Sequence, residues 1–128
     1  MQEEDTGSNI LIVDDDELVS EYLRALLEVE GYAVTVMNDS PQALNHFTEN
    51  PDFFDLVVTD QVMPVLTGVE MSRSILELRP NIPIVLITGY SERINEENAE
   101  SHGLSSFFPK PINEEQFLNK IKDLLLSY

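Results

Sequence analysis

The segment Ile10–Asp16, with the sequence ILIVDDD, joins four aliphatic residues directly to three aspartates. Two further runs, Leu56–Thr59 (LVVT) and Ile84–Ile87 (IVLI), are also rich in β-branched residues and do not alternate with polar ones. Strands buried on both faces have this composition, and they belong to parallel sheets covered by helices. Ala33–Met37 and Leu104–Phe108 are weaker strand candidates. The sequence therefore predicts five strands.

Amphipathic stretches separate these runs and predict helices. From Leu18 onward the apolar residues recur at helical spacing, and the pattern ends at Gly31. The pair Ser40-Pro41 predicts the start of a second helix, with Ser40 as its N-cap and Pro41 in the first helical position. A third helix is expected to stop before Pro80, and it is marked by Met71, Ile75 and Leu78.

The last part of the chain predicts two more helices. Asn113 is expected to cap a final helix, whose apolar residues are Phe117, Leu118, Ile121, Leu124 and Leu125. The segment Ser91–His102 has only two apolar residues, so we expect a helix there with few core contacts.

Strands and helices thus alternate along the chain, with short connections. This order favours a doubly wound α/β fold with a five-stranded parallel sheet and helices on both faces. The flavodoxin-like strand order 2-1-3-4-5 suits five strands in a chain of this length. Residues 1–8 are expected to form a flexible lead-in, and residues 9–128 a single domain.

The composition excludes several classes of function. The chain has 128 residues, 24 acidic and 7 basic side chains, a formal net charge of −17 and no cysteine. Nucleic acid is not expected as a partner, because its phosphates would be repelled. The longest aliphatic runs have four residues, far short of a membrane span. The lack of cysteine excludes disulfides and thiolate metal sites and fits a reducing cytosol, so we expect a cytoplasmic protein.

Polar residues stand at the carboxyl ends of four predicted strands. Asp14 and Asp15 follow the first strand, Asp60 and Thr88 end the third and fourth, and Lys110 follows the fifth. In a parallel sheet these ends share one edge, where ligands bind. Carboxylates ~4 Å apart repel by ~4 kcal/mol at an effective dielectric of ~20, so a cluster of them needs a cation or a shared proton. Oxygen ligands favour Mg²⁺ over zinc.

With Mg²⁺ bound, one carboxylate can act as a nucleophile toward phosphorus and form an acyl phosphate. Lys110 can then supply a positive charge and Thr88 a hydroxyl donor to the phosphoryl oxygens. Each residue alone also has a structural interpretation. Asp16 is expected to cap a helix, Thr88 can bond to backbone, and Lys110 can be a solvated surface residue. Only their joint occurrence at one edge favours a site.

These residues resemble the receiver domain of two-component response regulators, from about Asn9 to Tyr128. The resemblance rests on four motifs in order: the acidic pair in ILIVDDD, the pattern D-x-x-M-P-x-x-x-G, the threonine of LITG and the lysine of FFPKP. The second motif consists of Asp60, Met63, Pro64 and Gly68. Each motif alone is weak, but all four with this spacing are highly specific.

The resemblance implies a role for each matching residue. Asp60 would accept a phosphoryl group from a phosphohistidine on a sensor histidine kinase or a histidine phosphotransfer protein. Asp15 and Asp60 would ligate Mg²⁺ directly, Asp14 through water, and the main-chain carbonyl of Val62 would complete the protein ligands. Lys110 would pair with the phosphoryl oxygens.

The resemblance also implies a conformational switch. Thr88 would move toward the phosphoryl group, Phe107 would occupy the position of the switching aromatic residue, and Pro111 would follow a cis peptide bond. Phosphorylation would alter the surface around the fourth helix, the fifth strand and the fifth helix, through which a downstream protein would bind. The segment Ser91–His102 is expected to rearrange because few core contacts hold it.

The chain departs from the family pattern at several positions. Phe107 replaces the common tyrosine, so its switch would depend on packing alone. Val62 and Tyr90 flank the path of a water that attacks the acyl phosphate, and we expect them to hinder hydrolysis. Gly103-Leu104 replaces the usual Gly-Ala, which is expected to alter the packing beneath the fourth helix.

Three interpretations remain open at the level of sequence. The favoured one is a signalling phosphoacceptor, which is not an enzyme beyond its own phosphorylation and dephosphorylation. The second is a pseudo-receiver that only binds partners, and the third is a Mg²⁺-dependent phosphohydrolase with an aspartyl nucleophile. The chain is expected to be either a stand-alone receiver or a receiver from a longer protein, such as the C-terminal receiver of a hybrid sensor histidine kinase.

Overall fold

The computed structural model describes residues 8–89 and 103–126. In this part of the chain five parallel strands form one sheet in the order β2-β1-β3-β4-β5. The elements in chain order are β1 (Asn9–Val13), α1 (Glu17–Val29), β2 (Ala33–Met37), α2 (Ser40–Glu49), β3 (Leu56–Asp60), α3 (Gly68–Leu78), β4 (Ile84–Thr88), β5 (Ser106–Pro109) and α5 (Glu114–Leu126). The predicted doubly wound fold and its strand order are confirmed.

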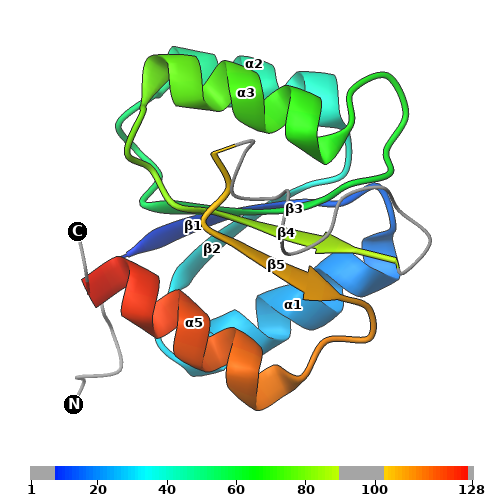
Figure 1. The fold of residues 1–128 in the computed structure, drawn as a ribbon, viewed down its shortest axis with the longest axis vertical. Helices are drawn as coiled ribbons and strands as arrows, with labels where there is room; N and C mark the ends of the chain where they lie inside the picture. The colour runs from blue at the N-terminus through cyan, green and yellow to red at the C-terminus, as the bar shows by residue number, and fades with distance from the viewer. Residues whose placement is uncertain (1–7, 90–102, 127–128) are drawn as a thin grey trace.

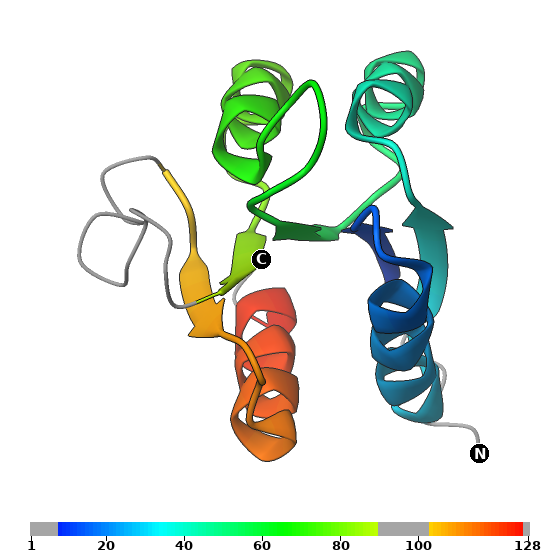
Figure 2. The same cartoon turned by 90° about the vertical axis from the view of Figure 1, so that its right-hand side faces the viewer.

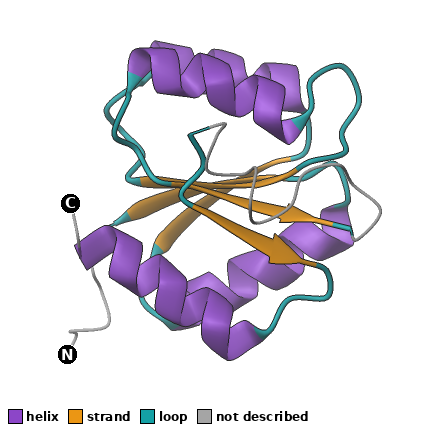
Figure 3. Ribbon diagram, in the orientation of Figure 1, coloured by secondary structure: helices purple, strands orange, loops and turns teal. Residues whose placement is uncertain are grey.

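The helices cover the sheet in two layers. α2 and α3 lie on one face, and α1 and α5 lie on the other (Figure 1). The view turned by 90° shows the two pairs on opposite sides of the sheet (Figure 2). Figure 3 shows the strands between the two helical layers. No helix in the described ranges is long and apolar enough to cross a membrane.

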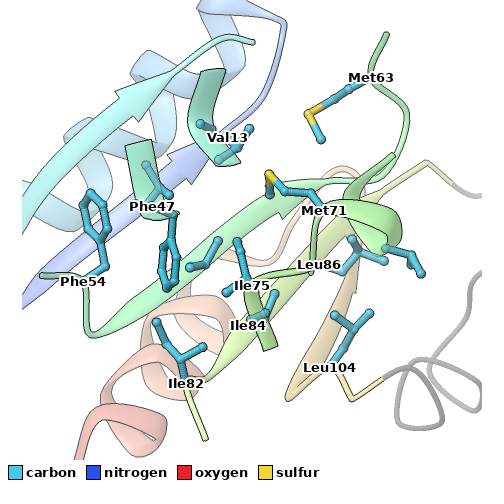
Figure 4. Packing of buried hydrophobic residues seen from close by; sticks show 14 residues of the cluster. Val13, Phe47, Phe54, Met63, Met71, Ile75, Ile82, Ile84, Leu86 and Leu104 are labelled. Atoms are coloured by element: carbon cyan, nitrogen blue, oxygen red, sulfur yellow. The ribbon is translucent and has the colours of Figure 1, made fainter. Parts of the chain in front are cut away.

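Each face of the sheet has its own hydrophobic core. On the side of α2 and α3, Phe47, Phe54 and Ile75 pack against strand residues such as Leu86 (Figure 4). On the side of α1 and α5, Leu27 and Phe117 belong to the second cluster, with strand residues Ile10, Ile12, Leu56, Val58, Val85 and Ile87. Alternate residues of the central strands enter the two clusters, which explains why their sequences lack polar alternation.

The predicted start of α2 is wrong by one residue. Asp39, not Ser40, is the N-cap, because its carboxylate accepts a hydrogen bond from the Gln42 N–H at 3.0 Å. The Ser40 hydroxyl instead donates to the carbonyls of Pro64 and Leu66, at 3.2 and 3.0 Å. The residue predicted to cap the helix therefore ties α2 to the loop after β3.

Other boundaries differ slightly from the prediction. β5 runs from Ser106 to Pro109, two residues later at its start than predicted. Leu104 is buried in the core on the α2 and α3 side, but it precedes the strand. Asp16 caps α1 and the Asn113 side chain accepts from the Gln116 N–H, in agreement with the sequence. The helix expected within Ser91–His102 and most of the expected lead-in lie outside the described residues.

Candidate functional site

The carboxyl ends of adjacent strands bring the predicted polar residues together. β1 lies between β2 and β3, and β3 pairs with β4, so Asp14 and Asp60 come from neighbouring strands. On the other side of β3 in the strand order, Thr88 of β4 pairs in register with Pro109 of β5, and the Lys110 N–H donates to the Thr88 carbonyl at 2.8 Å. The parallel topology therefore places two acids, one hydroxyl and one lysine at one edge.

Three carboxylates form a cluster at this edge. Asp14, Asp15 and Asp60 each offer a carboxylate oxygen, and these oxygens lie within 4.8 Å of one another. Asp14 and Asp60 are buried, with 2% and 7% of their surface exposed, whereas Asp15 is exposed. The cluster therefore combines two buried charges with one that faces solvent.

Lys110 partly balances these charges. Its Nζ lies 3.0 Å from Oδ1 of Asp60 and 4.0 Å from Oδ2 of Asp14. The lysine side chain keeps about a third of its surface exposed, at 34%. One ammonium group therefore faces two buried carboxylates, and the site retains an excess of negative charge.

The pKa values of these groups reflect their burial first and the neighbouring charges second. Burial raises the pKa of Asp14 from 3.8 to about 6, a hydrogen bond from the Asp16 N–H opposes this rise, and Asp60 adds to it. Burial also raises the pKa of Asp60, although its hydrogen bond with Lys110 acts against it. For Lys110 burial alone would lower the pKa, but the bond and the charge of Asp60 raise it above its ordinary value. The buried acids are thus held in a site that favours a proton or a cation.

The main chain around Asp14 is held by several hydrogen bonds. The Asn38 side chain donates to the Asp14 carbonyl at 2.7 Å and to Oγ of Ser20 at 3.0 Å. The Asp16 N–H donates to Oδ1 of Asp14 at 2.9 Å. These bonds connect the end of β1 with α1 and with the residue after β2, so the Asp14 carboxylate has a defined position.

The Thr88 hydroxyl does not make the hydrogen bond to the backbone that a purely structural role would give it within the described residues. The residue is fully buried, but its Oγ1 has no hydrogen-bond partner within the described parts of the chain. A buried hydroxyl without a partner is costly and calls for an explanation. The Thr88 hydroxyl therefore has no acceptor among the described residues, and its residue ends β4 at the same edge of the sheet as the acidic cluster.

The loop after β3 approaches the site closely. A Cβ atom at Gly68 would lie 2.3 Å from the main-chain oxygen of Asp60, so only glycine fits where α3 starts. Between these residues Val62 is 57% exposed, and Val65 is exposed and has a φ of 73°. This backbone angle is rare for a β-branched residue. The loop is therefore packed tightly at its ends and strained in its middle.

Two residues implied by the resemblance lie outside the cluster. Phe107 pairs with Leu86 on β4 and packs, half-buried, against the core on the α2 and α3 side. Pro111 is exposed, and the Lys110–Pro111 peptide bond is cis. Sequence reasoning missed Gln61 and Asn38, because their contacts depend on segments that only the folded chain brings together.

The donor set of the cluster fits one class of metal. Its side chains offer carboxylate oxygens, which are the ligands that Mg²⁺ and other hard cations prefer. The orphaned Thr88 hydroxyl and the lysine beside Asp60 add donors for an anionic group. The site can therefore accommodate a hard cation together with a phosphoryl group.

Comparison with known proteins gives concordant results. The profile of the family described as "Response regulator receiver domain" matches residues 10–122. The transcriptional regulatory protein CpxR homolog of Haemophilus influenzae is 34% identical over 118 residues, which cover 92% of this chain and 50% of that protein. The response regulator receiver protein CpdR of Brucella abortus is 30% identical, with 92% of this chain and 97% of CpdR covered.

The solved structures agree with this result. The response regulator receiver domain protein from Clostridium thermocellum has a TM-score of 0.88 and 28% identity, with 94% of this chain and 95% of that chain covered. The chain spans about half the length of the CpxR homolog and of several other curated relatives that it matches. The likeness to CpxR is therefore confined to part of that protein.

Proposed function

The chain belongs to the response regulator receiver family, a family of signalling domains, and on this premise we propose that Asp60 accepts a phosphoryl group from a phosphohistidine. The observation that carries the proposal is the contact between Asp60 and Lys110 inside the acidic cluster. A buried carboxylate beside a lysine and two further acids is a costly arrangement for the fold, and it supports a functional role for Asp60. The partner would be a sensor histidine kinase or a histidine phosphotransfer protein.

The transfer step conserves atoms and charge. A carboxylate oxygen of Asp60 attacks the phosphorus, an O–P bond forms, and the N–P bond to the donor histidine breaks. The electron pair of that bond stays on the imidazole nitrogen, which then takes up a proton from water. The product is an acyl phosphate on Asp60 and a free histidine on the donor.

Lys110 and Thr88 would stabilise the transferred group. The phosphoryl group brings about two negative charges, and the lysine Nζ already lies 3.0 Å from the reacting carboxylate. The Thr88 hydroxyl is a second donor, because it has no partner within the described residues. The Thr88 hydroxyl can donate to a phosphoryl oxygen without giving up a hydrogen bond to a described residue.

A Mg²⁺ ion would be held by Asp14, Asp15 and Asp60, with the main-chain carbonyl of Val62. When bound, it would supply the positive charge that three carboxylates and a phosphoryl group lack with a single lysine. The oxygen donors within 4.8 Å of one another and the raised pKa of Asp14 support this assignment.

Phosphorylation would be reported to a partner through the surface of β5, α5 and the expected fourth helix, which lies outside the described residues. Thr88 and Phe107 would link the site to this surface, since they lie on paired strands. A groove lined by Phe107, Phe108, Gln116 and Lys120 runs along β5 and α5 and supports the choice of surface. Because Phe107 has no hydroxyl, its contribution would come from packing.

Incubation with Mg²⁺ and phosphoramidate tests the proposed function. We expect a mass gain of about 80 Da, the mass of one phosphoryl group. This gain should not occur when EDTA is present during the incubation, nor in Asp60→Asn. Steady release of phosphate from unrelated monoesters would instead indicate a phosphohydrolase. Lack of any modification, with partner binding retained, would indicate a pseudo-receiver.

A further inference from the structure

Gln61 directly follows the candidate phosphoacceptor and makes two hydrogen bonds to the start of α3. Its main-chain carbonyl accepts from the Gly68 N–H at 3.0 Å. Its side-chain Oε1 accepts from the Val69 N–H at 2.9 Å. Gln61, which lies outside the helix, therefore joins the start of the loop 61–69 to its end.

These bonds complete the N-terminus of α3. The first four N–H groups of a helix have no partner within the helix. At α3 a capping box between Thr67 and Glu70 satisfies two of them. Gln61 satisfies the other two, those of Gly68 and Val69. The start of α3 therefore depends on Gln61 as much as on its own capping residues.

The same residue also contacts the site. The Gln61 main chain acts to lower the pKa of the Asp60 carboxyl, against the effect of burial. The main-chain oxygen of Asp60 lies only 2.3 Å from the point where a Cβ atom at Gly68 would stand. Asp60 and the first turn of α3 are thus in direct contact, and Gln61 follows the one in sequence and accepts hydrogen bonds from the other.

The loop between these bonds needs to be held in place. Val65 has a φ of 73°, and a strained backbone of this kind persists only where surrounding contacts impose it. The contacts that do so include Gln61 at one end of the loop and the Ser40 hydroxyl at Pro64 and Leu66. The loop also carries Val62, whose main-chain carbonyl is a candidate metal ligand.

We infer that Gln61 is a positioning residue of the site: its side-chain amide holds the loop that carries Val62, whose main-chain carbonyl would bind the cation together with the Asp60 carboxylate. This inference rests on the proposed function. Groups that orient metal ligands change metal affinity by about 10- to 100-fold when they are lost. Gln61 acts through the backbone, so we expect an effect at the lower end of that range.

Three variants test the inference. Gln61→Met keeps the size of the side chain and removes the acceptor, whereas Gln61→Glu keeps an acceptor oxygen at the same reach. Gln42→Met makes the same change as the first variant at an exposed position of α2 and serves as the control. Mg²⁺ affinity is measured by calorimetry without a phosphodonor, and amide hydrogen exchange is followed at residues 68–70.

We expect Gln61→Met to bind Mg²⁺ about tenfold more weakly and to lose protection at the Val69 amide. The Glu70 amide should stay protected, because its acceptor is Thr67. Gln61→Glu should restore both the affinity and the Val69 protection, and Gln42→Met should match the wild type.

Two results would overturn the inference. One is a folded Gln61→Met with wild-type Mg²⁺ affinity, even if its melting temperature falls, because Gln61 would then only cap α3. The other is a Val69 amide that exchanges in the wild type as fast as an unprotected one, which decides the matter even if Gln61→Met does not fold. Both readouts are taken without phosphorylation, so an Asp60 that is never phosphorylated contradicts the proposed function alone.

Discussion

At the scale of single residues, Val65 shows the cost of the loop after β3. Its φ of 73° places a β-branched residue in the left-handed region, which costs roughly 1–2 kcal/mol. Asparagine adopts this region more readily, so we expect Val65→Asn to raise the free energy of unfolding by about 1 kcal/mol. Urea unfolding of this variant measures the gain. Val62→Asn makes the same change in the same loop at an exposed position without this backbone angle, and it should leave the stability unchanged.

Val62 also bears on the lifetime of the phosphoryl group. Its exposed side chain stands two residues after the proposed phosphoacceptor and offers no hydrogen bond to an attacking water. A single hydrogen bond of ~1 kcal/mol corresponds to about fivefold in rate, so Val62→Asn should speed dephosphorylation by about that factor. The decay of the phosphorylated mass after removal of the donor measures it. An unchanged decay would count against the prediction, and Val65→Asn is the control.

The buried carboxylate of Asp14 predicts a dependence of stability on pH. Its pKa rises from 3.8 in the unfolded chain to about 6 in the folded protein. Folding therefore binds a proton between these values, and the stability that Asp14 contributes is lost as the pH rises from about 4 to above 6. The metal-free protein should become less stable across this window.

Asp14→Asn isolates this effect. Asparagine retains an oxygen for the Asp16 N–H and removes the charge that faces Asp15, Asp60 and Lys110. A pKa change of this size corresponds to ~3 kcal/mol, which solvent and salt screening reduce to about 1–2 kcal/mol. We expect the variant to be more stable by this amount at pH 7 in EDTA and to show a flatter pH profile. A variant less stable than the wild type at pH 7 would contradict the prediction.

At the scale of elements, α1 has two large exposed aliphatic residues with different surroundings. Leu18, 84% exposed, lies in the first turn of α1, just after the acidic cluster, whereas Val29, 77% exposed, ends the helix. A protein that delivers a phosphoryl group to Asp60 must cover the edge where Leu18 lies. We therefore expect Leu18 to contact the donor and Val29 to remain outside that contact.

Truncation of these two side chains tests the contact. Leu18→Ala should reduce kcat/KM for transfer from a phosphohistidine protein by about tenfold, which corresponds to ~1.4 kcal/mol of lost apolar contact. Its rate with phosphoramidate should not change, because the small donor makes no such contact. Val29→Ala should match the wild type with both donors, and an equal loss in the two variants would contradict the assignment.

The elements also show what the sequence could predict. The aliphatic runs determined the strands correctly, because a strand buried on both faces tolerates few polar residues. The cap of α2 was misjudged, because Asp39 and Ser40 are both good capping residues and the competing acceptors for Ser40, Pro64 and Leu66, lie far along the chain. β5 was placed too early because the buried Leu104 contacts the core from outside the strand.

The site follows a similar rule. Topology alone brings Asp14, Asp60 and Lys110 to one edge, so their proximity could be predicted from the order of the strands. The bonds that hold them could not. Gln61 acts through amides seven and eight residues away, and Asn38 reaches back to the end of β1. No spacing in the sequence indicates such contacts.

At the scale of the whole molecule, the acidic character has two parts. Asp14, Asp15 and Asp60 account for only three of the 24 acidic residues, so the net charge of −17 is mostly a property of the remaining chain. The cluster is the proposed cation site, and the other acidic residues are expected to favour a basic surface on a partner and to disfavour nucleic acid. These preferences stay predictions, to be tested with the partner in hand.

The central claim is that this fold serves to phosphorylate one carboxylate, and locating the phosphoryl group tests it most directly. The protein is incubated with Mg²⁺ and phosphoramidate, reduced with borohydride, which converts an aspartyl phosphate to homoserine, and digested for peptide mass spectrometry. We predict homoserine at position 60 and unmodified aspartate at Asp14 and Asp15. Homoserine at position 14 or 15, or none at all in the folded, Mg²⁺-loaded protein, would contradict the account.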